Sequence, residues 1–134
     1  VLAHSRELLR HSGETNVIYI DGDISDPATI IDNPQARDIL DFDQPVGYIH
    51  AAIWHFVPDD ADPWALTRQY MDAVPTGSYL ALSHVTADGQ DEAKVQRFKD
   101  VYQKSTSPLH FRTREEIARF FNGLGFLPPY EGAE

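Results

Sequence analysis

Three apolar runs separated by helical patterns constrain the fold of this chain most strongly. The runs cover residues 17–20, 46–53 and 78–85, and each reads as a strand, the first of them buried on both faces. Helical patterns lie before, between and after them. Because parallel strands need helical crossovers, this alternation predicts an α/β fold with a parallel sheet flanked by helices. A length of 134 residues suits one domain, so we expect residues 1–134 to form a single domain.

Turn and cap residues place the ends of the predicted helices. Gly13 ends the first helix, and residues 113–116, with the sequence TREE, form a capping box. Asp26, Asn33 and Asp62 each precede a proline, which is typical of a capping side chain followed by the first helical turn. Residues 125–127 read as the start of a further strand. The helical residues expected to face inward are Ile39, Leu40, Phe42, Leu66, Tyr70, Val74, Val95, Phe98, Val101, Tyr102, Ile117, Phe120, Phe121 and Leu124.

The amino-acid composition limits the classes of partner that this chain is expected to bind. Asp and Glu number 21 against 11 Lys and Arg, which gives a net charge of −10, and no basic stripe stands out. This balance repels a phosphate backbone, so it argues against nucleic acid and favours a neutral or cationic small molecule. The longest apolar run, residues 46–57, carries two histidines and is too short to span a membrane. Cysteine is absent, which excludes disulfides and thiolate metal sites and makes a cytoplasmic location the expectation.

Polar segments follow each predicted strand, and the first is the acidic stretch 21–26. Ligands of open parallel sheets bind at the carboxyl ends of the strands. Gly22 lets the backbone turn, so that Asp23 can project from the strand end and accept a hydrogen bond from an exocyclic amine such as that of adenine. Ile24 is placed to press on an aromatic ring. The alternative is that these carboxylates are turn residues in water, and Asp26 is interpreted as a helix cap.

The second segment, residues 51–60 with the sequence AAIWHFVPDD, combines small and aromatic residues. Ala51 and Ala52 keep the strand end open to a ligand. The faces of Trp54 and Phe56 could stabilise a cation by about 0.5–2 kcal/mol. Alternatively, both rings are core residues beneath a loop, the commoner position for aromatic side chains.

Histidine is the residue type here with acid–base chemistry near pH 7. None of the six histidines has the i,i+4 spacing of a helical zinc site, so no metal is expected. His55 and His84 lie near the ends of consecutive strands and are candidate general bases, with the alternative that each simply forms hydrogen bonds. The chain carries no glycine-rich phosphate loop, nucleophile elbow or Walker lysine, so hydride transfer and phosphoryl transfer lack their usual motifs.

Five segments together resemble the bacterial S-adenosyl methyltransferase family. They are VLAHSRELL, DGDISDP, AAIWHFVPDD, GSYLALSHVTADG and STSPLHFRTREEIARFFNGL, in that order. The resemblance implies a Rossmann-like class I methyltransferase sheet and S-adenosylmethionine as cofactor, with a small molecule of unknown identity as methyl acceptor. It also implies that Asp23, next to Gly22, holds the adenine amino group and that Ile24 packs on the ring. The residues implied to line the methionine and sulfonium part are Ala52, Ile53, Trp54, His55 and Phe56, with His55 and His84 as candidate bases.

The chain departs from the family pattern in one respect. The family's glycine-rich loop and the acidic residue that binds the ribose have no counterpart here. We therefore expect the 134 residues to be part of a longer protein, an incomplete form of the class I fold. The alternative is a non-catalytic module of the same fold that binds a cofactor or a protein, and a dehydrogenase-type nucleotide fold is a weaker third possibility.

Overall fold

A computed structural model describes residues 2–13, 15–102 and 108–127. The chain forms two compact units. The first unit comprises residues 1–48 and 65–79, and the second comprises residues 49–64 and 80–134. Strands β1 (Gly47–Ala51) and β2 (Tyr79–Ser83) each begin in the first unit and continue into the second.

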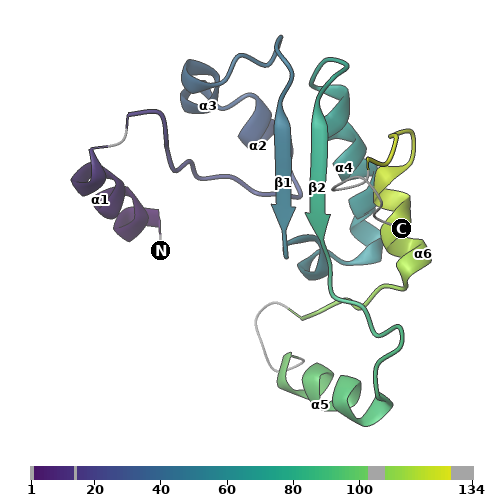
Figure 1. The fold of residues 1–134 in the computed structure, drawn as a ribbon. Helices are drawn as coiled ribbons and strands as arrows, with labels where there is room; N and C mark the ends of the chain where they lie inside the picture. Colours follow the sequence, from purple (N-terminus) through teal and green to yellow (C-terminus); the bar gives the residue numbers. More distant parts are fainter. Residues whose placement is uncertain (1, 14, 103–107, 128–134) are drawn as a thin grey trace. The chain divides into compact units, whose positions relative to one another are not determined.

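The strands β1 and β2 form a two-stranded sheet, and their arrows point the same way in Figure 1. Helix α4 (Pro63–Asp72) lies in the connection between them along the chain, which is the helical crossover that parallel strands require. The predicted α/β class with a parallel sheet is therefore confirmed. No helix within the described residues combines the length and the apolar character needed to cross a bilayer.

The first unit holds three helices before β1. They are α1 (Leu2–Ser12), α2 (Ala28–Ile31) and α3 (Pro34–Ile39). Gly13 ends α1 with a φ of +74°, a left-handed conformation that favours glycine. Asn33 caps α3, because its side-chain oxygen accepts a hydrogen bond of 3.0 Å from the Gln35 amide. Both helix boundaries are as predicted.

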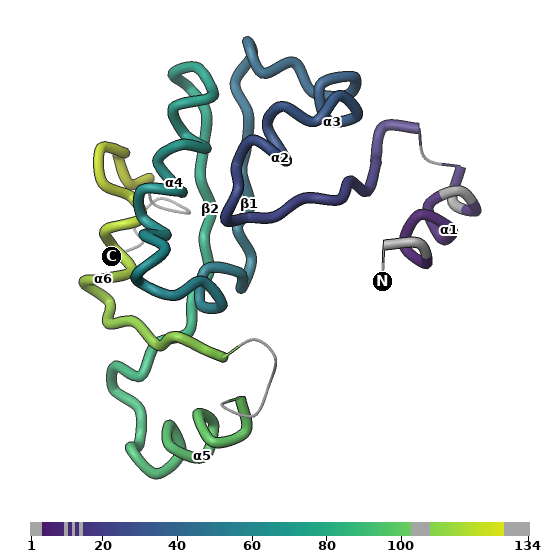
Figure 2. Tube along the Cα trace, turned by 180° about the vertical axis from the view of Figure 1, so that it is seen from behind, coloured from purple at the N-terminus to yellow at the C-terminus, as the bar shows by residue number. Residues whose placement is uncertain are grey.

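The second unit is built on short helical turns and two further helices. The 3₁₀ turns are η1 (Trp54–Phe56), η2 (Asp59–Ala61) and η3 (Arg119–Phe121), and the helices are α5 (Glu92–Tyr102) and α6 (Arg114–Ala118). From behind, Figure 2 shows the chain leaving β2 and reaching α5 through a loop. The capping box of α6 is confirmed, since the Thr113 hydroxyl accepts from the Glu116 amide and the Glu116 carboxylate accepts from the Thr113 amide.

Two predicted strands are wrong. Residues 17–20 form no strand, and the side chains of Val17, Ile18 and Tyr19 are exposed. A strand exists through backbone hydrogen bonds to a neighbour, and no described segment pairs with this one. Residues 125–127 form no strand either.

Some predicted packing is also wrong. Asp26 does not cap α2 with its side chain. Instead its carbonyl accepts from the Thr29 hydroxyl at 2.7 Å. Four residues expected to face inward are exposed: Ile39, Leu40, Phe98 and Val101. An apolar helix face becomes buried only where another element covers it, and helical spacing alone does not supply that element.

Candidate functional site

In the first unit, Asp23 forms a tight turn that leaves one carboxylate oxygen available. Its Oδ1 accepts a hydrogen bond of 2.8 Å from the Ser25 amide, and its carbonyl accepts from the Asp26 amide at 2.9 Å. Its own amide donates to the Thr29 hydroxyl at 3.0 Å. Among the described residues, none donates a hydrogen bond to the second oxygen, Oδ2. The turn therefore holds an exposed acceptor oxygen in a defined position.

The neighbours of Asp23 fix this turn from both sides. A Cβ on Gly22 would lie 2.6 Å from Cγ1 of Ile30, so close packing favours glycine here and any larger residue would displace Ile30. The φ of Gly22 is not in the left-handed region, so the penalty for a Cβ at this position comes from the packing of Ile30 and not from the backbone dihedral. The carbonyl of Ile24 accepts a hydrogen bond of 3.2 Å from the Tyr70 hydroxyl, which links the turn to α4.

The Tyr70 hydroxyl remains a donor over the whole physiological pH range. Burial, followed by the charges of nearby groups including Asp23 and Asp26, raises the pKa of Tyr70 to about 12. The ring meets Tyr48 edge to face, with centroids 5.6 Å apart. Tyr70 therefore anchors the Ile24 carbonyl as a neutral hydroxyl.

In the second unit, Ala52 starts the segment after β1 with a strained turn. Its φ is +52°, which is uncommon for a residue with a Cβ, and its amide donates to the Ser83 hydroxyl at 2.9 Å. Ile53, which follows, is half-buried and precedes η1. The carboxyl ends of β1 and β2 are thus tied together where a ligand site was predicted.

Trp54 and Phe56 take different positions. The Trp54 side chain is 0% exposed, stacks on Phe120 at 5.9 Å and donates its indole N–H to Nδ1 of His50 at 2.9 Å. Its ring is thus a core group of the second unit, the alternative left open by the sequence. Phe56 is 39% exposed, and its ring meets that of His55 at 4.5 Å. Of the two aromatic rings, Phe56 is the exposed one and Trp54 the buried one.

Arg112 is the centre of this unit, and sequence reasoning did not identify it. The residue is 2% exposed. Its guanidinium donates to the carbonyls of Trp54 at 2.9 Å and Val57 at 2.7 Å, and to one carboxylate oxygen of Asp59 at 2.6 and 3.0 Å. It also lies 2.8 Å from Nε2 of His84. One buried cation therefore holds the segment after β1 against the segment after β2.

The contact with Arg112 fixes the protonation of His84. Because a guanidinium only donates, Nε2 of His84 must accept, and its proton lies on Nδ1, which donates to the Val85 carbonyl at 2.7 Å. Burial is the main cause that lowers the pKa of His84, and Arg112 acts in the same direction, whereas the Val85 contact opposes it. His84 is therefore a neutral imidazole whose basic nitrogen is already engaged.

His55 lies beside His84, with ring centroids 5.5 Å apart, so the two histidines predicted to approach each other do so. The side chain is buried, and within the described part of the chain its Nδ1 has no hydrogen-bond partner. Burial, and then Arg112, lowers the pKa of His55. Residues 2–13, 15–102 and 108–127 contain no group of three His, Asp or Glu side chains that could hold a metal ion. The cluster therefore contains a neutral imidazole nitrogen that is buried and unpaired among the described residues.

One family of known proteins matches almost the whole chain. The model of a family described as S-adenosyl methyltransferase matches residues 1–130. The chain belongs to this family. The resemblance seen in the sequence is thus confirmed, and Arg112, His55 and His84 all lie within the matched methyltransferase region.

Two solved structures resemble this methyltransferase-family chain. A DUF574 family protein from Streptomyces avermitilis is 38% identical, with a TM-score of 0.76, over 84% of this chain and 42% of its own. A proposed methyltransferase from Thermobifida fusca is 28% identical, with a TM-score of 0.83, over 96% of this chain and 47% of its own. The chain thus spans less than half the length of either structure. None of the curated proteins matches it.

Proposed function

We propose that this chain serves methyl transfer from S-adenosylmethionine to a small-molecule acceptor. The observation that carries the proposal is the family match over residues 1–130. The likeness to the proposed methyltransferase from Thermobifida fusca supports it. When bound, the cofactor supplies a methyl group activated by a positively charged sulfur.

The groups available in each unit suit parts of this cofactor. In the first unit, Oδ2 of Asp23 has no donor among the described residues, so Asp23 would accept from the adenine amino group while Ile24 packs on the ring. Gly22 keeps this turn compact. In the second unit, Ala52 and Ile53 would line the methionine part, together with the backbone of Trp54. The exposed aromatic ring of Phe56 suits a cationic sulfur.

His55 is the better placed of the two candidate bases. Its lowered pKa keeps the imidazole neutral at pH 7, and its Nδ1 is unpartnered among the described residues. Because this nitrogen is buried, the His55 ring would have to turn towards the acceptor to take a proton from a nucleophile that must lose one. His84 would first have to break its contact with Arg112, because that contact occupies its basic nitrogen. We therefore assign the base to His55 and a supporting position to His84.

Calorimetric titration of the full chain with S-adenosylmethionine and with its demethylated product tests the proposal. Asp23→Asn is the informative variant, because an amide oxygen can still accept from the Ser25 amide while the NH₂ group replaces the free acceptor. We expect binding to weaken roughly tenfold to a hundredfold, the range for a hydrogen bond to a charged group. Asp21→Asn removes the same charge two residues away and should leave the affinity within about twofold.

Two results would count against the proposal. Absence of heat with either ligand at millimolar concentration would refute cofactor binding. Equal affinity of the Asp23→Asn variant and the unmodified chain would refute the adenine role of Asp23.

A further inference from the structure

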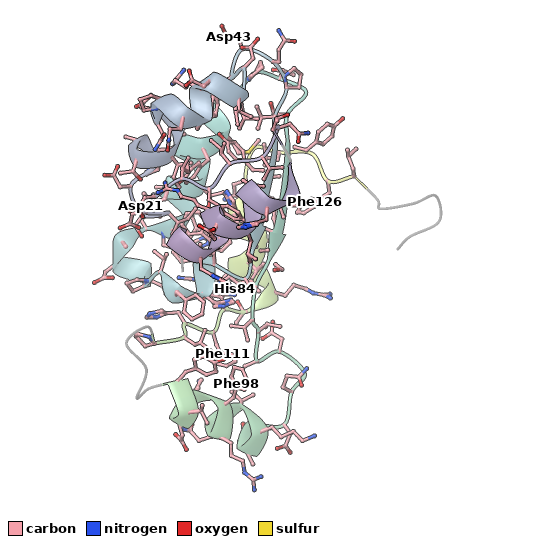
Figure 3. The ribbon with its side chains drawn as sticks, turned by 90° about the vertical axis from the view of Figure 1, so that its left-hand side faces the viewer. Asp21, Asp43, His84, Phe98, Phe111 and Phe126 are labelled. Atoms are coloured by element: carbon pink, nitrogen blue, oxygen red, sulfur yellow. The ribbon has the colours of Figure 1, made fainter. Side chains whose placement is uncertain are left out.

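The second unit contains a cavity of about 210 Å³. None of the residues assigned to the cofactor or to the base lines it. One side is formed by α5 and the other by the segments that lead from β2 and into α6. In Figure 3, His84, Phe111 and Phe98 follow one another from the histidine cluster towards α5. The cavity is lined by Val85, Thr86, Gln90, Lys94, Val95, Phe98 and Phe111.

Aromatic rings form part of the cavity wall and leave a surface open. Phe98 and Phe111 meet edge to face with centroids 6.1 Å apart, and Phe98 also contacts Tyr102 at 5.0 Å. Phe98 is nevertheless 45% exposed. Because exposed aromatic surface is unfavourable in water and rings pack well edge to face or offset, a flat ring inserted here would gain both burial and stacking.

The cavity lining is positively charged, whereas the chain as a whole is negatively charged. The chain carries a net charge of −10, yet the lining contains no carboxylate and one lysine, Lys94. A second lysine, Lys99, places its Nζ 5.3 Å from the centre of the Phe111 ring. Among the described residues, Lys94 forms no ion pair with Asp or Glu. A ligand with a negative group would therefore find a cation here that is not already neutralised by a paired carboxylate.

The cavity adjoins the histidine cluster through two short segments. Val85 lines the cavity, and its carbonyl accepts the hydrogen bond from Nδ1 of His84. Phe111 lines it as well and directly precedes Arg112. A molecule in the cavity would thus lie next to Val85, which contacts His84, and next to the chain neighbour of Arg112, and Arg112 contacts His84 as well.

We propose that this cavity binds the methyl acceptor and that the acceptor is a small aromatic acid, a ring bearing a carboxylate or phosphate group. The inference rests on the proposed function for the acceptor role. A volume of about 210 Å³ lies below the range of roughly 300–1,000 Å³ typical of ligand pockets, which suits a compact acceptor.

Titration of the ¹⁵N-labelled full chain, followed by amide chemical shifts, tests the proposal. The probes are benzoate, phenyl phosphate, the neutral benzamide and the non-aromatic cyclohexanecarboxylate. We expect both aromatic anions, or one of them, to shift the amides of the lining residues, with benzamide and cyclohexanecarboxylate binding at least threefold more weakly. The comparison of benzoate with phenyl phosphate identifies the preferred anion.

The matched variants are Lys94→Gln and Arg97→Gln, both on α5. Each removes one positive charge from the helix, but only Lys94 lines the cavity. We expect Lys94→Gln to weaken binding of the aromatic anion about threefold or more, as for an exposed charge pair, and Arg97→Gln to change it by less than twofold.

The results separate this inference from the proposed function. Equal effects of Lys94→Gln and Arg97→Gln, or shifts confined to other residues, would overturn the cavity assignment. If S-adenosylmethionine still binds in that sample, the proposed function stands. If the aromatic anions bind in the cavity but the cofactor does not bind at all, the acceptor role is overturned together with the proposed function.

Discussion

Replacing Arg112 with methionine should destabilise the fold more than any other single change considered for this chain. Methionine fills a comparable apolar volume but removes the charge and all the hydrogen-bond donors. Arg112 is buried and donates to two carbonyls, those of Trp54 and Val57, and to Nε2 of His84. The substitution leaves the Val57 carbonyl and Nε2 of His84 without this donor, whereas the Trp54 carbonyl keeps its hydrogen bond of 3.1 Å from the Val57 amide.

The size of the effect follows from which partners are buried. The Asp59 side chain is 62% exposed, so its ion pair contributes about 1 kcal/mol at most. Each buried acceptor left unpaired costs roughly 1–3 kcal/mol. Allowing for relaxation, we expect Arg112→Met to lower the free energy of unfolding by about 3–5 kcal/mol, the range for breaking one side of a buried charged network. That is a large share of a typical total stability of about 5–15 kcal/mol.

Urea unfolding followed by circular dichroism and tryptophan fluorescence measures this change, and NMR of the histidine side chains adds a second readout. Without the guanidinium, Nε2 of His84 is released and a nearby positive charge disappears, so the pKa of His84 should rise. Arg112→Lys keeps the charge but not the planar fork, and should fall between the methionine variant and the unmodified chain.

Arg119→Met is the matched control. The Arg119 guanidinium lies 4.0 Å from the centre of the Trp64 ring, and the residue is exposed. Losing that contact should cost about 1 kcal/mol or less. A loss of less than 1 kcal/mol in Arg112→Met, or a His84 spectrum that does not change, would refute the view of Arg112 as the centre of the second unit.

Three further predictions concern both units. Gly22→Ala should lower stability by about 1–3 kcal/mol in thermal melts, because the added Cβ would lie 2.6 Å from Ile30, and an unchanged melting temperature would contradict this. Tyr70→Phe should cost about 1 kcal/mol through its lost hydrogen bond. The folded pKa of Tyr70, about 12, is above its ordinary value of 10, so the unmodified chain should lose stability between pH 10 and 12 and the variant should lose less. Burial lowers the pKa of His84, so stability should be complete above pH 6.5 and fall as the pH drops towards the lowered value. His84→Gln should reduce that acid dependence in melts between pH 7 and 5, and an identical dependence would contradict this.

The features predicted correctly from the sequence are mostly those set by neighbouring residues. The capping box joins Thr113 to Glu116, the Asn33 cap reaches Gln35, and Gly13 needs only its own backbone freedom. Such contacts form within one turn of helix, so residue types at fixed spacing are enough to identify them. The alternation of strand β1, helix α4 and strand β2 was likewise predicted from the sequence, because a parallel pair of strands requires a helical connection.

The errors arise where a structure depends on a distant partner. Residues 17–20 have the composition of a buried strand, but no described segment offers backbone groups to pair with them. Phe98 and Ile39 follow helical spacing yet remain exposed, because the spacing identifies an apolar face without identifying what covers it. The same limit applies to Trp54, for which cofactor contact and core packing fit the sequence equally well.

Arg112 shows how a long-range feature could still be inferred from a local one. It directly precedes Thr113, the capping residue of α6, and this position normally packs a hydrophobic side chain back against the first turn of the helix. The entry geometry of a capped helix therefore points this side chain into the protein. An arginine in an inward position must find acceptors to offset its desolvation, and the carbonyls after a strand end, which have no partner in the sheet, are suitable acceptors. A charged residue just before a capping box, in a chain with open strand ends, is thus a signal for a buried anchor. Here it identifies the residue that holds His84 and the Trp54 carbonyl in place.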